Sequence, residues 1–400
     1  MAEHDVDLFV IGGGSGGVRA ARIAAEHGAK VMLAEEYRLG GTCVIRGCIP
    51  KKLLVYASRF HGEFEDAAGF GWTVPHASFD WTTFIANKDR EIARLEAAYG
   101  ATLAKAGVKV LKTRGVFLDA HTIQLADGSR VRARHVLIAT GATPSYGDPI
   151  SGIEHVISSN EAFHLPDFPR RVVIQGGGYI AVEFAGIFAG LGSHVALVYR
   201  GENILRGFDH DVRHHLRAEM EARGIRVLTG CKVAAVEDAG GHFLVRLSSG
   251  TQIPADRVMF ATGRVPNIAK MGLKEAGVEI AANRGIAVDE YSRTTAPNVY
   301  AVGDVTSAPV PRVGVIAEGE AKTLAEVLIH HIRGGDTPPP YHGVATCYIE
   351  FGDTRVARFD ADFLSGPNPV ASFTEASEDL ATSKKEWAAS RRRRWFGIRD

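Results

Sequence analysis

Cysteine, net charge and long apolar stretches are scarce in this sequence. Four cysteines occur in 400 residues, which excludes the disulfide-rich framework of a small secreted protein. The 46 basic and 46 acidic residues cancel, so no overall basic field attracts nucleic acid. No run of about 18 apolar residues is present to cross a membrane, and the N-terminus MAEHDVDLFV lacks the layout of a signal peptide. We expect a cytoplasmic protein without a nucleic-acid partner.

Glycine, in contrast, is abundant and patterned near the N-terminus. Residues 6–14 are typical of a buried strand ending in glycines, 15–28 of a helix, and 30–36 of a second strand. Gly12, Gly14 and Gly17 have the spacing G-x-G-x-x-G, which lets a pyrophosphate approach the backbone at a helix N-terminus. Glu35 ends the second strand, where a carboxylate accepts hydrogen bonds from a ribose. The spacing alone is weak, but this context predicts a dinucleotide site.

A second strand, glycine turn, helix and strand follow at 170–200. Gly176, Gly178 and Ala181 match G-x-G-x-x-A. The second strand ends without an acid, at Tyr199 and Arg200, and Arg206 follows. Cations there suit the 2′-phosphate of NADPH. The alternative is that both arginines are merely solvated.

Two dinucleotide sites on one chain predict two cofactors that exchange electrons. Other strand ends fit such sites: Thr140 and Gly141 close VLIATG, Gly263 closes VMFATG, and Asp304 closes NVYAVGD and could bind a ribityl or pyrophosphate group. We predict an α/β fold with two Rossmann-like dinucleotide-binding domains. The first comprises 1–145 and 266–335, and the second, 146–265, is inserted in it. Residues 336–400 form a short, atypical C-terminal region.

Two of the cysteines lie close together in GGTCVIRGCIPKK (40–52). Residues five apart on a regular helix are separated by about 7.5 Å along its axis, whereas a disulfide needs Cα atoms within about 7 Å. Cys43 and Cys48 can therefore bond only if the helix is distorted, which Gly47 and Pro50 favour. Zinc would need a second ligand pair, so we expect no metal. A redox pair and inert buried thiols both remain open.

Together the motifs GGTCVIRGCIPKK, GGGYIAVEFA and YRGENILRGFD resemble the glutathione reductase branch of the class I flavoprotein disulfide reductases, over about residues 5–310. The resemblance implies FAD in the first domain, NADPH in the second and glutathione disulfide as the likeliest substrate. It also implies a redox disulfide, with Cys48 next to the flavin and Cys43 attacking the substrate.

Further roles follow only from the resemblance. Lys51 would lie by the flavin and pair with Glu183, and Tyr179 would be a gate that moves when nicotinamide enters. The other matched positions contact the flavin (Ser15, Gly16, Glu35, Thr42, Gly115, Asp304), NADPH (Ile180 beside Tyr179 in GGGYIAVE, with Arg200 and Arg206) or glutathione disulfide (Ser15, Arg22, Tyr99). Tyr99 also suits the apolar face of an amphipathic helix.

The resemblance fades after Asp304. No His-Pro dipeptide, which carries that family's general acid, occurs in the sequence. Segments 310–335 and 341–369 resemble the C-terminal part of sulfide:quinone oxidoreductase-type flavoproteins, as if two related flavoproteins had been joined. The histidines after the join, His330, His331 and His342, match no family motif. Cys347 resembles a cysteine near the flavin of such oxidoreductases, but we expect a buried structural thiol.

Three functions follow from these motifs. The leading one is an NADPH-dependent reductase of a small-molecule disulfide. The others are electron transfer to a quinone at a membrane surface and a non-catalytic flavin-binding hybrid. The basic, aromatic segment 384–400 predicts either a weak contact with an anionic membrane or a solvated tail. A homodimer would need a surface other than the family's usual interface domain, which is replaced here.

Overall fold

The computed structural model describes residues 4–334, 338–350 and 354–396, with the backbone alone at Glu350, Ala388 and 391–396. The chain divides into two compact units. The first unit contains Met1–Ile45, Arg94–Ala142 and Pro266–Asp400. The second unit contains Arg46–Ala93 and Thr143–Val265.

A parallel sheet forms the centre of the first unit. Its strands lie in the order β3-β2-β1-β6-β17, with β1 (Val6–Ile11), β2 (Val31–Ala34), β3 (Lys109–Leu111), β6 (Arg130–Ile138) and β17 (Val299–Ala301). The other part of β6 pairs antiparallel with β5 (Thr122–Leu125), which pairs with β4 (Gly115–Phe117). Runs such as VDLFVI suit this place because a covered parallel sheet buries both faces of each strand.

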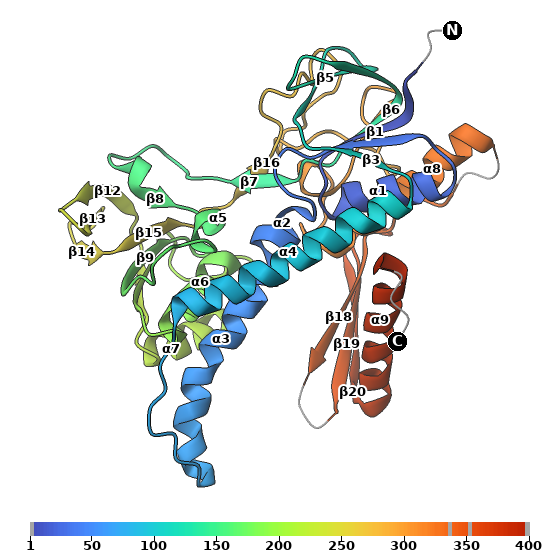
Figure 1. The fold of residues 1–400 in the computed structure, drawn as a ribbon. Helices are drawn as coiled ribbons and strands as arrows, with labels where there is room; N and C mark the ends of the chain where they lie inside the picture. The colour runs from blue at the N-terminus through green and yellow to red at the C-terminus, as the bar shows by residue number, and fades with distance from the viewer. Residues whose placement is uncertain (1–3, 335–337, 351–353, 397–400) are drawn as a thin grey trace. The chain divides into compact units, whose positions relative to one another are not determined.

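Two helices cover one face of this sheet. Helix α1 (Ser15–Glu26) and helix α8 (Gly314–Arg333) lie side by side (Figure 1). Their small and apolar residues, including Ala21 and Leu324, share a core with Leu8 and Val10 of β1. Phe9 of β1 points to the opposite core. In such a parallel β-α-β arrangement, ligands bind at the carboxyl ends of the strands.

The second unit repeats the pattern. Its parallel sheet has the order β11-β10-β9-β15-β8, with β8 (Val156–Ile157), β9 (Arg171–Gln175), β10 (His194–Tyr199), β11 (Arg226–Thr229) and β15 (Arg257–Phe260). The helices of this unit include η2 (Ile153–His155), α5 (Ser159–Ala162), α6 (Tyr179–Gly190) and α7 (His210–Ala222). An antiparallel sheet of β12 (Val233–Asp238), β13 (Phe243–Leu247) and β14 (Gln252–Ala255) shares a core with the parallel sheet. The mixed α/β fold with two Rossmann-like parts confirms the predicted fold class.

The segment 46–93 lies in the second unit, although the predicted boundaries put it in the first domain. It contains α3 (Cys48–Ala67), η1 (Ala68–Phe70) and the start of α4 (Trp81–Lys105). Leu54 and Trp81 share a core with Phe184 of α6, and the Trp81 indole donates to the Leu165 carbonyl at 2.8 Å. This packing between segments far apart in sequence explains the difference. The remaining connecting elements are α2 (Gly41–Arg46), β7 (Ala142–Pro144), β16 (Arg264–Pro266) and η3 (Gly303–Val305).

The C-terminal region is an antiparallel sheet of β18 (Val344–Glu350), β19 (Val356–Asp362) and β20 (Val370–Ser377), followed by α9 (Glu378–Phe396). Helix α9 packs on β19 and β20, and Tyr348 contacts Trp387 of this helix. Cys347 precedes Tyr348 on β18, so its side chain leaves the opposite face of the sheet, and it is exposed. The expectation of a buried thiol there is wrong.

Across the described ranges, no helix is long and apolar enough to cross a membrane. The predicted membrane contact of 384–400 stays a prediction, because 397–400 and the side chains of 391–396 lie outside the described residues.

Candidate active site

The first glycine turn joins β1 to α1. Gly12 has φ +108°, which favours glycine, and a Cβ at Gly17 would overlap the Gly12 carbonyl oxygen. Gly14 differs, because the nearest atom to a Cβ there, the Gly41 Cα, lies 3.6 Å away. Gly14 caps α1 without a side-chain hydrogen bond, so the first N–H groups of the helix remain available. This turn fits the pyrophosphate of a dinucleotide.

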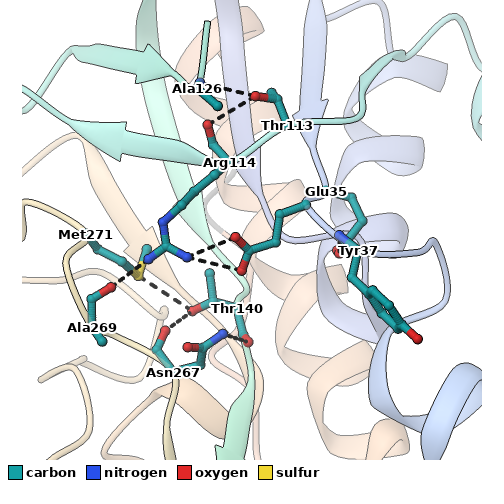
Figure 2. Close-up of polar contacts among 10 residues, drawn as sticks. Glu35, Tyr37, Thr113, Arg114, Ala126, Thr140, Asn267, Ala269 and Met271 are labelled. Carbon is teal, nitrogen blue, oxygen red and sulfur yellow. Dashed lines mark hydrogen bonds and ion pairs between the residues drawn. The ribbon is translucent and has the colours of Figure 1, made fainter. Parts of the chain in front are cut away.

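Glu35 lies directly after β2, beside this turn. One carboxylate oxygen accepts from the Gly13 N–H at 2.7 Å, and the other accepts from the Tyr37 N–H at 2.8 Å. Figure 2 shows Glu35 and Tyr37 beside each other. The carboxylate is therefore held at the carboxyl end of the sheet, where a ribose would bind.

The carboxyl end of β6 is held by a separate network. The Thr140 hydroxyl donates to the Asn267 carbonyl at 2.8 Å, and Gly141 has φ +66°. Arg114 donates to the Ala269 carbonyl at 2.6 Å (Figure 2). These contacts fix the chain where it leaves and re-enters the first unit, so the strand end has one defined position.

Asp304 lies in η3, directly after β17. The turn is held through Gly303, whose φ is +78° and whose N–H donates to the Glu320 carboxylate at 2.6 Å. Arg312 donates to the Asp304 carbonyl. Glu320 is 5% exposed, and burial raises the pKa of its carboxyl to about 7. The predicted flavin-binding aspartate thus lies on a rigid turn.

The two neighbouring cysteines lie on different helices. Helix α2 ends at Arg46 and α3 begins at Cys48, because Gly47, with φ −153° and ψ −119°, breaks the helix. Cys43 is half-buried and Cys48 is exposed. The expectation that 43–48 is not one regular helix is confirmed.

Gly41 is a site residue that the motifs did not single out. It has φ +62°, and a Cβ there would lie 2.6 Å from the Gly14 Cα. The segment that carries Cys43 therefore passes directly over the first glycine turn. The glycine pair before Thr42 and Cys43 was the available signal.

Lys51 and Glu183 join α3 to α6. The Lys51 ammonium lies 2.8 Å from a carboxylate oxygen of Glu183, and both side chains are about one-third exposed, at 31% and 32%. The expected pairing is confirmed. Lys51 is three residues after Cys48, on the same face of α3, and Cys48 is in the first turn of that helix.

The second glycine turn joins β9 to α6. Gly176 has φ +149°, no atom lies within 4 Å of a Cβ placed at Gly178, and Gly178 caps α6 without a side-chain bond. This turn also fits a pyrophosphate. Arg200 and Arg206 are exposed, and neither guanidinium has an ion-pair partner within the described chain. Two unpaired cations after β10 fit a 2′-phosphate.

The remaining predicted residues occupy varied settings. Tyr179, the expected nicotinamide gate, begins α6 and is 54% exposed. Arg22 is only 9% exposed, and its Nη1 donates to both carboxylate oxygens of Glu26 at 2.7 and 2.8 Å. Tyr99 packs against the apolar core, as expected of an amphipathic helix.

Four other predicted residues lie beside the glycine turns or at strand ends. Ser15 and Gly16 start α1, Ile180 is the second residue of α6, and Gly115 starts β4. Their roles stay predictions, as do those of Thr42 and Gly263.

The histidines of α8 belong to a cluster with β6 and β17 in the first unit. The His331 ring stacks on His135 of β6 at 6.1 Å between centroids, and the Tyr300 hydroxyl lies 3.3 Å from its Nδ1. His330 adjoins the same cluster. No group of three or more His, Cys, Asp or Glu side chains is placed to hold a metal ion among the residues the structure describes.

Residues 6–321 match the family model described as pyridine nucleotide-disulphide oxidoreductase. The chain is 52% identical to glutathione reductase of Burkholderia cepacia over 342 residues, which cover 86% of this chain and 74% of that protein. It is 45% identical to glutathione reductase of Nostoc sp., over 80% of this chain and 72% of the relative. Trypanothione reductase of Leishmania donovani is 37% identical over 86% of this chain and 74% of its own.

A solved structure of the flavoprotein disulfide reductase RclA from Escherichia coli, a Cu(II) complex, has a TM-score of 0.75. It is 24% identical and covers 89% of this chain and 77% of its own, which supports the fold alone. The alignment of 342 residues with the Burkholderia protein is longer than the expected span of 5–310, so the likeness continues past Asp304. With its two glycine turns, its paired cysteine segment and these relatives, the chain belongs to the pyridine nucleotide-disulphide oxidoreductase family.

Proposed function

We propose that this chain is an NADPH-dependent flavoprotein that reduces glutathione disulfide. The observation that carries the proposal is the presence, in one chain, of two dinucleotide turns and a cysteine segment whose helix is broken at Gly47. Relatives named as glutathione reductases support the substrate. The cofactors are FAD and NADPH. The first turn, with Glu35 and Asp304, would hold FAD, and the second, with Arg200 and Arg206, would hold NADPH.

Bound FAD would supply the redox chemistry: acceptance of hydride from NADPH and transfer of an electron pair to a disulfide. The chain's own chemistry is thiol–disulfide exchange. The Cys43 thiolate attacks one sulfur of glutathione disulfide, forms a mixed disulfide and releases one glutathione thiolate, which takes a proton. Cys48 then attacks the Cys43 sulfur and releases the second glutathione. The cysteine pair ends oxidised, and the substrate has gained two electrons and two protons.

The quinone alternative is not favoured. The relatives named above are disulfide reductases, and the C-terminal likeness to sulfide:quinone oxidoreductase-type proteins adds no second cofactor site. A homodimer, a cytoplasmic location and a weak membrane contact by 384–400 stay predictions. The domain limits 1–145, 146–265, 266–335 and 336–400 are retained as a proposal for the functional parts.

The test follows NADPH oxidation by the FAD-loaded protein, with glutathione disulfide and a soluble quinone offered in parallel. We expect consumption with the disulfide and little with the quinone. Cys43→Ser and Cys48→Ser should each abolish turnover, while flavin reduction by NADPH persists. Only Cys43→Ser should keep a long-wavelength absorbance band from a thiolate beside the flavin. Turnover of the disulfide that survives either substitution would refute the proposal.

A further inference from the structure

The residues that place the two unpaired arginines of the second unit can be identified from the contacts around them. Residues Arg200–Gly207 follow β10 and are here called the arginine loop. Arg200 is its first residue, and Arg206 is next to its last. A loop with a cation near each end can select a 2′-phosphate only if both ends have fixed positions.

The loop is attached to the second glycine turn on its inner side. The Leu205 N–H donates to the Gly177 carbonyl at 2.6 Å. The Tyr199 ring lies between Gly177 and Gly201: a Cβ at Gly177 would be 2.5 Å from that ring, and a Cβ at Gly201 would be 2.6 Å from it. The second glycine turn and the arginine loop are therefore held against each other.

The outer side of the loop is held by Arg213 of α7. Its Nε donates to the Ile204 carbonyl at 2.7 Å, and its Nη2 donates to the Asn203 carbonyl at 3.0 Å. Ile204 is fully buried, and Leu205 keeps φ at +53° although it is not a glycine. The guanidinium thus holds two successive carbonyls of a tight bend, which a lysine ammonium cannot do in the same planar manner.

Helix α7 is itself fixed close to the loop. Asp209 caps it by accepting from the N–H groups of Asp211 and Val212 at 3.0 and 3.2 Å, and the Arg213 N–H donates to the Asp209 carbonyl at 3.1 Å. The Asn203 Oδ1 accepts from the Ile204 N–H at 2.9 Å, which also restrains this bend.

We propose that Arg213 is a positioning residue for NADPH selection: it holds the arginine loop so that Arg200 and Arg206 meet the 2′-phosphate. This inference rests on the proposed use of NADPH. Arg213 acts through the loop and not by contact with the phosphate. Its loss should weaken recognition of the 2′-phosphate and leave recognition of the rest of the adenosine nucleotide unchanged.

The test titrates the oxidised, FAD-loaded protein with 2′,5′-ADP and with 5′-AMP by calorimetry, so that no turnover is needed. Arg213→Met removes two hydrogen bonds and should weaken 2′,5′-ADP binding about tenfold, with 5′-AMP unchanged. Arg213→Lys keeps the charge but not the planar fork, and should resemble Arg213→Met. Arg223→Met, at the opposite end of α7, is the charge-matched control, because Arg223 is exposed and the two side-chain bonds to the Asn203 and Ile204 carbonyls come from Arg213. It should bind like the wild type.

Each outcome separates the two proposals. A wild type without preference for 2′,5′-ADP over 5′-AMP would overturn NADPH use, and this inference with it. A wild type that prefers 2′,5′-ADP, with Arg213→Met equal to Arg223→Met, would overturn this inference alone. Full rescue by Arg213→Lys would mean that charge, not loop geometry, matters. Equal weakening of both nucleotides would reveal general damage to the second unit and also contradict a role in selection.

Discussion

A buried carboxyl lies beside the turn that carries Asp304 in the first unit. Glu320 is 5% exposed and accepts a hydrogen bond from the Gly303 N–H at 2.6 Å. Burial raises its pKa from 4.5 to about 7, because an ionised carboxylate loses hydration that one hydrogen bond does not replace. The residue therefore links the position of Asp304 to pH.

The sign of this linkage gives a prediction for stability. The folded protein binds the Glu320 proton more tightly than the unfolded chain does. The contribution of Glu320 to the free energy of unfolding is therefore largest below pH 4.5. It should fall by about 3 kcal/mol as pH rises from 4.5 to about 7 and then level off. Glu320→Gln should lose this dependence, because the amide does not titrate.

Urea unfolding between pH 5 and 8 measures the difference. Glu326→Gln, on the exposed side of the same helix α8, is the control and should follow the wild type. Parallel pH profiles for the wild type and Glu320→Gln would show that Glu320 does not carry the linkage.

Helix α1 depends on one close approach to the strand before it. A Cβ at Gly17 would overlap the Gly12 carbonyl oxygen and lie 3.2 Å from Val10, so Gly17→Ala must push α1 away from β1. We expect purified Gly17→Ala to lack FAD, with a much reduced ratio of absorbance at the flavin band to that of the protein, because the pyrophosphate would lose its N–H donors.

Gly186→Ala is the matched control for a helix glycine. Gly186 lies inside α6 with no atom within 4 Å of an added Cβ. Alanine should raise stability there by about 0.5–1 kcal/mol and leave FAD bound. A yellow, fully loaded Gly17→Ala protein would show that the turn tolerates a displaced helix.

The elements differ in how far the sequence predicted them. Both strand–turn–helix units could be predicted, because glycine spacing and apolar strands are local signals, and the pairing of Lys51 with Glu183 followed from the family motifs. The grouping of 46–93 with the second unit could not be predicted, since it depends on Leu54 packing against α6. Arg213 belongs to no motif, and its role depends on two backbone carbonyls that only the folded loop brings together. Exposure of Cys347 depends on which face of its sheet α9 covers.

At the scale of the whole molecule, the two half-reactions should differ in rate. The cofactor turns and the cysteine segment are present, so NADPH should reduce the flavin rapidly. Reoxidation by glutathione disulfide needs a proton for the leaving thiolate, and general acid catalysis typically contributes about 10²–10⁴-fold. No His-Pro motif supplies it in this sequence, and His331 is engaged by His135 and Tyr300. Stopped-flow absorbance should therefore show fast reduction and slow reoxidation.

His342→Gln is the informative variant for this prediction, because His342 is exposed and outside that cluster. Reoxidation as fast as reduction in the wild type would contradict the prediction. If His342→Gln then slowed it, His342 would be the missing acid.

The interleaving of the two units also sets an order of events during synthesis on the ribosome. The chain emerges from the ribosome with its N-terminus first, so both segments of the second unit have been made once Val265 has emerged. The first unit must still wait for Val299, which pairs with Val136 of β6, and for helix α8, which covers α1. Until then the apolar faces of β1 and α1 lack their partners, and such unfinished surfaces attract chaperones and aggregation. The second glycine turn, proposed to hold NADPH, is thus complete before the turn at Asp304, proposed to hold FAD, has been made. The nascent first unit is the part most in need of protection.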